Sequence, residues 1–520
     1  MKNSEELRQQ LRSINRKSYP AYKGLKGLYH FGNYILSIDH VQGDPFASPS
    51  HVSIQISHRD AGFPVEYYKD TLTGTTLCDY LTRQFEKQVS QYSFRAKGSG
   101  KSGLLTVSHC GQEILSRTAC EITEKGITAR FFVGFPANGR TINATELEKI
   151  LFDFLPVCIQ KSFFYSSLNA KELQNYIELA EDQEFIRQTL PAKNLCAFIA
   201  DGSILPRESG ISSRPMKASV PFTSPDSLRI SINLPHKGKI TGMGIPKGIT
   251  LIVGGGYHGK STLLNALELG VYNHIPGDGR EYVITDATAV KLRSEDGRFI
   301  KDVDISMFIN DLPNKKDTRC FSTLDASGST SQAAGIVESM EAGSHLFLLD
   351  EDTSATNFMV RDAFMQQVIQ REKEPITPFL ERAEDLYKKA GISTILVAGS
   401  SGAFFHIADT IIQMDNYVPK DITASVKKLC SQYPLPAVSV TDFQVPHSHR
   451  IMSRPAESSK RLRHNSRGNH SDSGAAKPER LKTRISGTDG FSLGRQEIDL
   501  RYTEQLIDAE QTAALGLLLK

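Results

Sequence analysis

Residues 249–264 read Ile-Thr-Leu-Ile-Val-Gly-Gly-Gly-Tyr-His-Gly-Lys-Ser-Thr-Leu-Leu, and this stretch decides the fold. An apolar run rich in β-branched residues stops abruptly at three glycines, and a helix-forming run follows. The pattern of Gly, four residues and then Gly-Lys-Ser is that of a phosphate loop, or Walker A motif, between a strand and a helix. The sequence therefore predicts a site for a nucleoside triphosphate.

Each residue type in the loop has a physical reason. Glycines let the backbone turn tightly, so that its amides face one anion. Lys260 reaches the β- and γ-phosphates, and the Ser261 hydroxyl completes the shell of a Mg²⁺ ion bound with ATP. The following helix adds partial positive charge at its N-terminus. The candidate nucleotide-binding residues here are Gly254, Gly255, Gly256, Tyr257, His258, Gly259, Lys260, Ser261 and Thr262.

Two acids follow a second apolar run, Ser344-His-Leu-Phe-Leu-Leu-Asp350-Glu351. A carboxylate at the end of a buried parallel strand is placed to hold magnesium through water, so Asp350 and Ser261 are the candidate metal residues. The adjacent Glu351 is then the candidate general base for the attacking water.

The acids and the loop after them, Asp350-Glu-Asp-Thr-Ser-Ala-Thr-Asn357, resemble the ABC-type ATPases. In that family a Ser-Gly-Gly-Gln signature opens a helix before this strand. Here Ser327-Gly-Ser-Thr-Ser-Gln332 begins 23 residues before Asp350, with Ser329 at the second glycine and Thr330 at the glutamine. The resemblance implies that Ser327, Gly328 and Ser329 contact the nucleotide held by a second chain, ahead of a helix expected over 332–341.

The resemblance also places Ser400 where the family has a switch histidine, whereas His406 corresponds to a surface position. Catalytic candidates are therefore Lys260, Glu351 and Ser400, and slow turnover is expected because serine carries no charge near neutral pH. No glutamine stands near Glu295, where the family's glutamine loop is sought.

Longer segments resemble a narrower group, the ABC-class ATPases that lack transporter partners. These segments are Val-Gln-Gly-Asp-Pro-Phe (41–46), Gly-Ser-Ile-Leu-Pro-Arg-Glu-Ser-Gly (202–210), the phosphate loop (254–262) and Ala-Ser-Gly-Ser-Thr-Ser-Gln (326–332). The similarity extends from about Tyr22 to Gln511. It implies a soluble homodimeric ATPase in which two chains enclose two nucleotides, with a link to RNA.

The amino-acid composition indicates the cellular compartment of the protein. The chain has 520 residues, 39% of them hydrophobic, and seven dispersed cysteines without a Cys-x-x-Cys pair. Reduced thiols, and the lack of a long apolar run or an apolar leader, favour a cytoplasmic protein without a membrane segment.

A basic stretch lies between Arg450 and Ile485, where positive side chains exceed negative ones by seven. Such a stretch neutralises phosphates, and Arg461, Arg463 and Arg467 are its candidate nucleic-acid contacts. The alternative is a solubilising linker, closed by a helix within 498–519.

The predicted fold class is α/β, an ABC-type P-loop ATPase core with an N-terminal α+β domain and a basic C-terminal extension. The expected domains are residues 1–215, a candidate for nucleic-acid binding, then the ATPase core at 216–430, and a basic linker with a C-terminal helix at 431–520. The loop at 201–215, which holds Arg207 and Arg214, is either a domain boundary or a loop that delivers polar groups to a ligand. Two other functions stay open: a nucleotide-gated binding protein with weak hydrolysis, and the ATPase subunit of a transporter.

Overall fold

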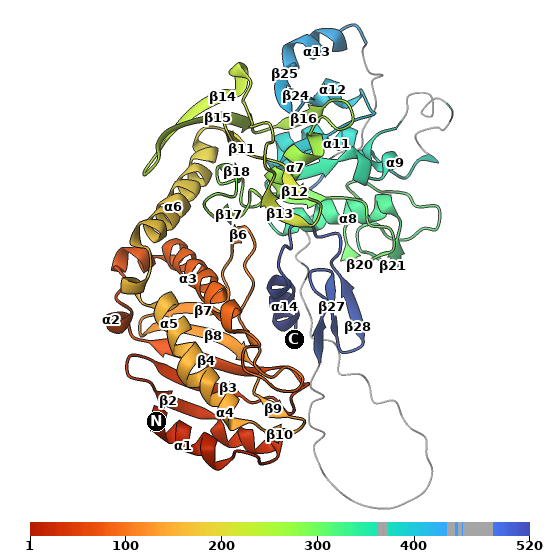
Figure 1. Cartoon of the computed structure of the whole chain (residues 1–520). Coiled ribbons are helices and arrows are strands. Elements are labelled where there is room, and N and C mark those ends of the chain that lie inside the picture. Colours follow the sequence, from red (N-terminus) through yellow and green to blue (C-terminus); the bar gives the residue numbers. More distant parts are fainter. Residues whose placement is uncertain (362–367, 369–372, 434–442, 446–449, 451–481) are drawn as a thin grey trace, which may run out of the picture.

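The computed structural model describes residues 1–361, 368, 373–433, 443–445, 450 and 482–520 (Figure 1). Its first part is an α+β domain around a seven-stranded sheet ordered β1-β2-β3-β4-β8-β5, with β7 also paired to β8. Alternating polar and apolar residues predict one buried face for these strands. Leu36, Ile54 and Phe131 from that face share one core with the helices. The elements are β1 (Lys2–Asn3), α1 (Ser4–Ser13), β2 (Gly27–His30), β3 (Ile35–His40), β4 (Ser50–Ile56), α2 (His58–Ala61), α3 (Thr71–Tyr92), β5 (Leu105–Thr106), β6 (Glu113–Ile114), β7 (Cys120–Thr123), β8 (Gly126–Val133), β9 (Ala137–Asn138), β10 (Thr141–Ile142), α4 (Ala144–Glu148) and α5 (Leu155–Phe163).

Helix α6 (Ala170–Ala192) leads from this domain to a four-stranded antiparallel sheet ordered β14-β15-β11-β18 (Figure 1). The division predicted at residue 215 does not follow this sheet, because β11 pairs with β15 on the other side of it. Sequence periodicity identifies strands but not their partners, so it does not reveal that this sheet takes strands from both sides of residue 215. The strands are β11 (Leu195–Ala200), β14 (Arg229–Leu234), β15 (Gly238–Pro246) and β18 (Val283–Thr285), with the hairpin β12 (Arg207–Ser209) and β13 (Ser212–Pro215) beside them.

A six-stranded sheet forms the centre of the ATPase part, in the order β19-β22-β23-β16-β24-β25. All neighbours are parallel except β24 and β25. The central strands are continuous apolar runs because helices cover both faces. The phosphate loop follows β16, and two carboxylates follow β22, which is separated from β16 only by β23. The strands are β16 (Ile249–Val253), β19 (Val290–Leu292), β22 (Leu346–Asp350), β23 (Ser393–Val397), β24 (Thr410–Asp415) and β25 (Val418–Asp421).

Helix α8 corrects one expectation. It begins at Gly328, four residues before the predicted start, because Ser327 is its N-cap and accepts a hydrogen bond from the Thr330 amide. The other elements here are α7 (Lys260–Leu269), β17 (Asn273–His274), β20 (Arg298–Val303), β21 (Phe321–Ala326), α8 (Gly328–Glu341), α9 (Thr356–Met359), α11 (Phe379–Ala390), α12 (Phe404–Ile407) and α13 (Thr423–Cys430).

The C-terminal segment contacts both domains. Three strands, β26 (Thr483–Ile485), β27 (Gly490–Leu493) and β28 (Gln496–Asp499), precede α14 (Ala509–Leu518), so residues 483–499 are a small sheet where the sequence predicted only a linker. Asp508 Oδ2 lies 2.8 Å from Arg117 Nη2 of the N-terminal domain, and Glu504 pairs with Lys291 of β19. We call residues 504–511 the clamp. None of the helices in the described part of the chain could cross a membrane.

Candidate functional site

The phosphate loop has a backbone that only glycine adopts without strain at two positions. Gly254 has φ +141°, and a Cβ there would lie 2.4 Å from the Met414 carbonyl oxygen. Gly259, with φ +97°, is the N-cap of α7. The loop also docks on the turn after β24, where the Asn416 amide donates a hydrogen bond of 2.9 Å to His258 Nδ1. The sequence-based prediction of a tight strand–loop–helix turn is confirmed.

Lys260 lies across the loop. Its Nζ donates hydrogen bonds to the carbonyl oxygens of Gly254 and Gly255 at 2.8 Å and 2.9 Å. Ser261, the next residue of α7, has an exposed side chain. The ammonium group is therefore held within the loop by two backbone carbonyls, next to an exposed serine at the helix start.

A cavity of about 600 Å³ adjoins the loop. One side is formed by the phosphate loop and Tyr417, and the other by a segment at 205–222 that we call the wall. The lining residues are Leu205, Pro206, Met216, Ala218, Ser219, Val220, Phe222, Tyr257, Gly259, Lys260, Ser261, Thr262 and Tyr417. Two residues of the 201–215 loop, Leu205 and Pro206, line this cavity. Sequence reasoning missed Tyr417 and the far end of the wall, which no motif marks.

Asp350 ends β22 with 8% of its surface exposed. Burial raises its pKa, although the Asp352 amide and the charges of Lys291 and Lys260 act in the opposite direction. A carboxylate that is destabilised by burial gains from a nearby cation. Together with the hydroxyl of Ser261 it offers the hard oxygen ligands that Mg²⁺ prefers, so the residue types fit this metal.

Glu351 contacts the loop after β23. Its Oε2 accepts hydrogen bonds from the amides of Gly399 (2.7 Å) and Ser400 (2.9 Å), and its Oε1 accepts one from the Ser400 hydroxyl (2.6 Å). Burial opposes ionisation, but the hydrogen bonds from Ser400 and Gly399 outweigh it and lower the pKa of Glu351. The carboxylate is therefore ionised and held by three donors.

The predicted signature lies at the start of α8. Ser327 is exposed, whereas Ser329 is 7% exposed and Ser331 only 1%. Ser327 Oγ lies 2.9 Å from Thr330 Oγ1. Of the hydroxyls expected to face a partner, the one on Ser329 thus points largely into the protein.

Gln332, in the first turns of α8, has a role that the sequence did not reveal. Its Nε2 donates to Ser354 Oγ at 3.0 Å, and its Oε1 accepts from the Ala355 amide at 3.0 Å. The signature helix is thereby tied to the loop after Asp350 and Glu351. The amide of Glu295, where a glutamine loop was sought, donates to Ser331 Oγ at 2.9 Å.

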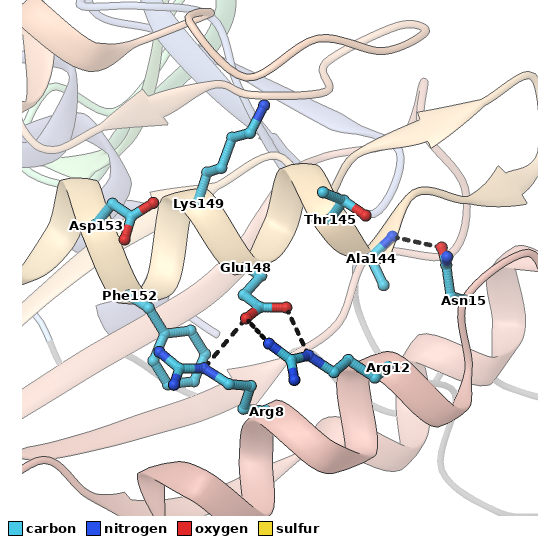
Figure 2. Close-up of a pocket in the computed structure, with 9 residues that line it drawn as sticks. All are labelled: Arg8, Arg12, Asn15, Ala144, Thr145, Glu148, Lys149, Phe152 and Asp153. Carbon is cyan, nitrogen blue, oxygen red and sulfur yellow. Dashed lines mark hydrogen bonds and ion pairs between the residues drawn. The ribbon is translucent and has the colours of Figure 1, made fainter.

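Arg461, Arg463 and Arg467 lie outside the described residues. A hollow of about 440 Å³ lies between α1 and α4 in the N-terminal domain, where Glu148 Oε1 is 3.1 Å from Arg8 Nε and 2.8 Å from Arg12 Nη2 (Figure 2). Because an internal carboxylate already faces both guanidinium groups, we place no ligand there.

Comparison with known proteins agrees with this geometry. A family model of the P-loop domain of ABC ATPases matches residues 169–449, and a model of the N-terminal part of ABC-class ATPases matches residues 4–166. An uncharacterised protein of Methanocaldococcus jannaschii is 31% identical over 266 residues, which cover 48% of this chain and 58% of that protein. The chain thus matches less than two thirds of that relative's length.

Similar solved structures include an ATP-binding cassette of an ABC transporter in its ADP conformation. It is 13% identical, with a TM-score of 0.25, and the match covers 37% of this chain and 88% of that chain. Another is cbiO1 from Clostridium perfringens, part of an ABC transporter complex, with 13% identity, a TM-score of 0.24, and coverage of 37% and 86%. TM-scores this low do not support any statement about this chain. Because the P-loop family model matches more than half of the 520 residues, the chain belongs to the ABC-class ATPases.

Proposed function

We propose that this chain binds ATP with Mg²⁺ and hydrolyses it slowly at the interface of a homodimer. One observation carries the proposal. The phosphate loop and the Asp350–Glu351 pair follow β16 and β22, two strands of one parallel sheet separated only by β23. In open α/β sheets, ligands bind at the carboxyl ends of the strands.

Each polar group then has a role in phosphoryl transfer. The amides of residues 254–262 surround the phosphates, and Lys260 moves from the carbonyl oxygens of Gly254 and Gly255 onto the β- and γ-phosphates. Ser261 and Asp350 would hold Mg²⁺, which would neutralise charge on the phosphate oxygens. Glu351, already ionised, accepts a proton from the attacking water.

The adenine is assigned to the cavity between the wall and Tyr417. Met216, Val220 and Phe222 supply apolar surface, and the cavity opens directly onto Lys260 and Ser261. Apolar walls with a few polar groups at one end are typical of sites for small ligands.

The dimer follows from surfaces that one chain leaves uncovered. Ser327 is exposed at the N-terminus of the 14-residue helix α8, and Leu324 just before it is 81% exposed. Phe299, on the paired strand β20, is 56% exposed, and Tyr257 of the phosphate loop is 100% exposed. A second chain that covers these groups brings Ser327, the exposed residue of the signature, to the triphosphate.

RNA is the proposed partner of the basic stretch at 450–485. The support is the excess of seven positive charges and the family resemblance. The one described residue near its start, Arg450, pairs with Glu338 and Glu341 of α8 at 3.2 Å and 2.6 Å. This contact ties the beginning of the stretch to the signature helix.

A second candidate function, nucleotide-gated binding with weak hydrolysis, is favoured by the contact between Ser400 and Glu351. Three donors hold the proposed base, and the position of the family's cationic switch residue is a neutral serine. Comparing steady-state hydrolysis with and without RNA separates the candidates, because an RNA-coupled ATPase is stimulated and a gate is not.

The test of the main proposal is Glu351→Gln. The amide keeps the size of the carboxylate but loses its basicity, so ATP with Mg²⁺ binds and persists uncleaved. Sedimentation should show a shift to a stable dimer with ATP and not with ADP, because bound triphosphate couples to association. Lys260→Ala should abolish the shift. Adding Ser327→Arg should block dimerisation while nucleotide binding remains.

Two results would contradict the proposal. Continued hydrolysis in Glu351→Gln removes this residue from the role of base. A dimer that forms to the same extent without ATP would show that bound nucleotide does not bridge the two chains.

A further inference from the structure

A buried polar cluster lies between the nucleotide cavity and the N-terminal domain. The side chains of His274 and Asp278 are 0% exposed, and that of Arg207 is 13% exposed. None of the three is among the residues that line the cavity or among the proposed catalytic groups. We call these three residues the junction.

The first contact of the junction is with the wall, through Arg207. Arg207 Nη2 donates to Asp278 Oδ2 at 2.9 Å, and Arg207 Nη1 donates to the Asp278 carbonyl oxygen at 2.8 Å. One residue earlier, Pro206 faces the cavity. The Leu205 carbonyl accepts from Arg280 Nε at 2.8 Å. The wall is therefore fixed to residues 278–280 on both sides of Pro206.

On its second side the junction holds the helix that follows the phosphate loop. His274 Nε2 lies 3.1 Å from the carbonyl oxygen of Leu269, the last residue of α7, and His274 Nδ1 lies 2.9 Å from Asp278 Oδ2. The buried ring is therefore in contact with both the Asp278 carboxylate and the C-terminal end of α7. One imidazole thus joins the wall to the helix that carries Lys260.

On its third side the junction is part of a strand pair with the N-terminal domain. His274 belongs to β17, which pairs with β6 so that His274 lies opposite Glu113. The Ile275 amide also donates to the Gln112 carbonyl at 3.0 Å. Arg83 of α3 donates to the carbonyl oxygens of Gly111 and Glu113 and therefore fixes β6 to the N-terminal core.

We propose that His274, Asp278 and Arg207 are positioning residues that couple nucleotide in the cavity to the β6 region of the N-terminal domain. The inference rests on the proposed function, because it requires ATP to bind between the wall and the phosphate loop. ATP contacts the wall through its base and α7 through its phosphates. Helix α7 ends against the imidazole of His274, and the wall reaches the same imidazole through Arg207 and Asp278. The strand of His274 is hydrogen-bonded to β6, so a shift of either element reaches the N-terminal domain.

The experiment uses the full chain and two ligands, ATP with Mg²⁺ and inorganic tripolyphosphate with Mg²⁺. Affinity and hydrogen exchange of the amides at 111–115 are measured for the wild type, Arg207→Ala, Arg207→Lys and Asp278→Asn. The control is Arg214→Ala, an exposed arginine on the other strand of the same hairpin, outside the cavity lining.

In the wild type and in Arg214→Ala, ATP should slow exchange at 111–115. In Arg207→Ala, ATP should bind about tenfold more weakly, and at saturation it should leave exchange there unchanged. Tripolyphosphate, which reaches only the phosphate loop, should bind Arg207→Ala as it binds the wild type. Arg207→Lys should restore part of the effect, because it keeps the charge but loses the two-point contact.

The outcomes separate this inference from the proposed function. A wild type that binds neither ligand contradicts the proposed function. A wild type that binds ATP without altered exchange at 111–115, or an Arg207→Ala variant that still transmits the change, overturns the coupling. If Asp278→Asn does not fold, the test is made with Arg207→Ala only.

Discussion

The hydroxyl of Ser400 donates a hydrogen bond of 2.6 Å to Glu351 Oε1, and the amide of the same residue donates one of 2.9 Å to Oε2. One residue therefore satisfies both oxygens of the proposed general base. In the proposed mechanism, Ser400 would orient the base through these hydrogen bonds and would not sense the phosphate by charge.

Replacing Ser400 should change the pH dependence of hydrolysis. Ser400→Ala removes a donor that lowers the pKa of Glu351, so the base becomes protonated at higher pH. As pH falls, the rate of the variant should decline earlier than that of the wild type, and its rate at neutral pH should be modestly lower. Steady-state rates across pH measure this. An unshifted acid limb would show that Glu351 is not the titrating base.

Ser400→His adds the missing imidazole, so hydrolysis should rise or stay the same. A loss of about tenfold, or about 1.4 kcal/mol of barrier, would mean that Ser400 does not occupy the switch position.

Gly254→Ala should abolish ATP binding, whereas Gly256→Ala should preserve it. The first change puts a Cβ 2.4 Å from a backbone oxygen at φ +141°, and the second meets no atom within 4 Å. Strain of this kind costs about 1–3 kcal/mol and moves the loop that holds the phosphates. Titration with a fluorescent ATP analogue compares the two. Equal affinities would show that the loop does not bind phosphate in this conformation.

Val220→Asp should weaken ATP binding by about tenfold without affecting tripolyphosphate, because it places a charge in the apolar wall. Ile211→Asp is the matched control, since Ile211 is fully exposed on the same segment and does not line the cavity. Calorimetry with both ligands measures the difference. A parallel loss of both affinities in Val220→Asp would place the base elsewhere.

Neutralising Arg461, Arg463 and Arg467 together should reduce the salt dependence of RNA affinity. Each contact with a single strand adds about 0.7 to the slope of log affinity against log salt, so three contacts give a decrease of about two. Sequence preference should not change, because phosphate contacts do not read bases. An unchanged slope would make the basic stretch a linker.

Arg117→Met should destabilise the fold by about 3 kcal/mol, because it removes one of the two arginines paired with buried Asp79 and also the partner of Asp508. Arg117 is 4% exposed and lies 3.0 Å from Asp79, which is itself 0% exposed. Arg130→Met is the control, because the pair of Arg130 with Glu121 is about half exposed and contributes less than about 1 kcal/mol. Urea unfolding measures both. Similar losses would mean that the clamp contributes no stability.

The parts of the site that sequence predicted are those encoded by contiguous residues. Residues 254–262 fold as one turn, and Asp350 and Glu351 end one strand, so local pattern suffices for both. The strand pairing of β11 with β15, the approach of Tyr417 to the wall and the contact of His274 with Leu269 depend on which distant segments meet. Residues 483–499 were missed because their strands are short and largely polar, and their order comes from pairing with one another and from α14.

The clamp also has a consequence for how the chain is made. Asp508 and Arg117 are separated by 391 residues. At about 5–20 residues per second, a ribosome needs about 20–80 s to bridge that interval. Throughout this time Arg117 has Asp79 as a partner but neither Asp508 nor Glu510. The ion pairs between Arg117 and the clamp therefore form only after residues 508–510 have left the exit tunnel.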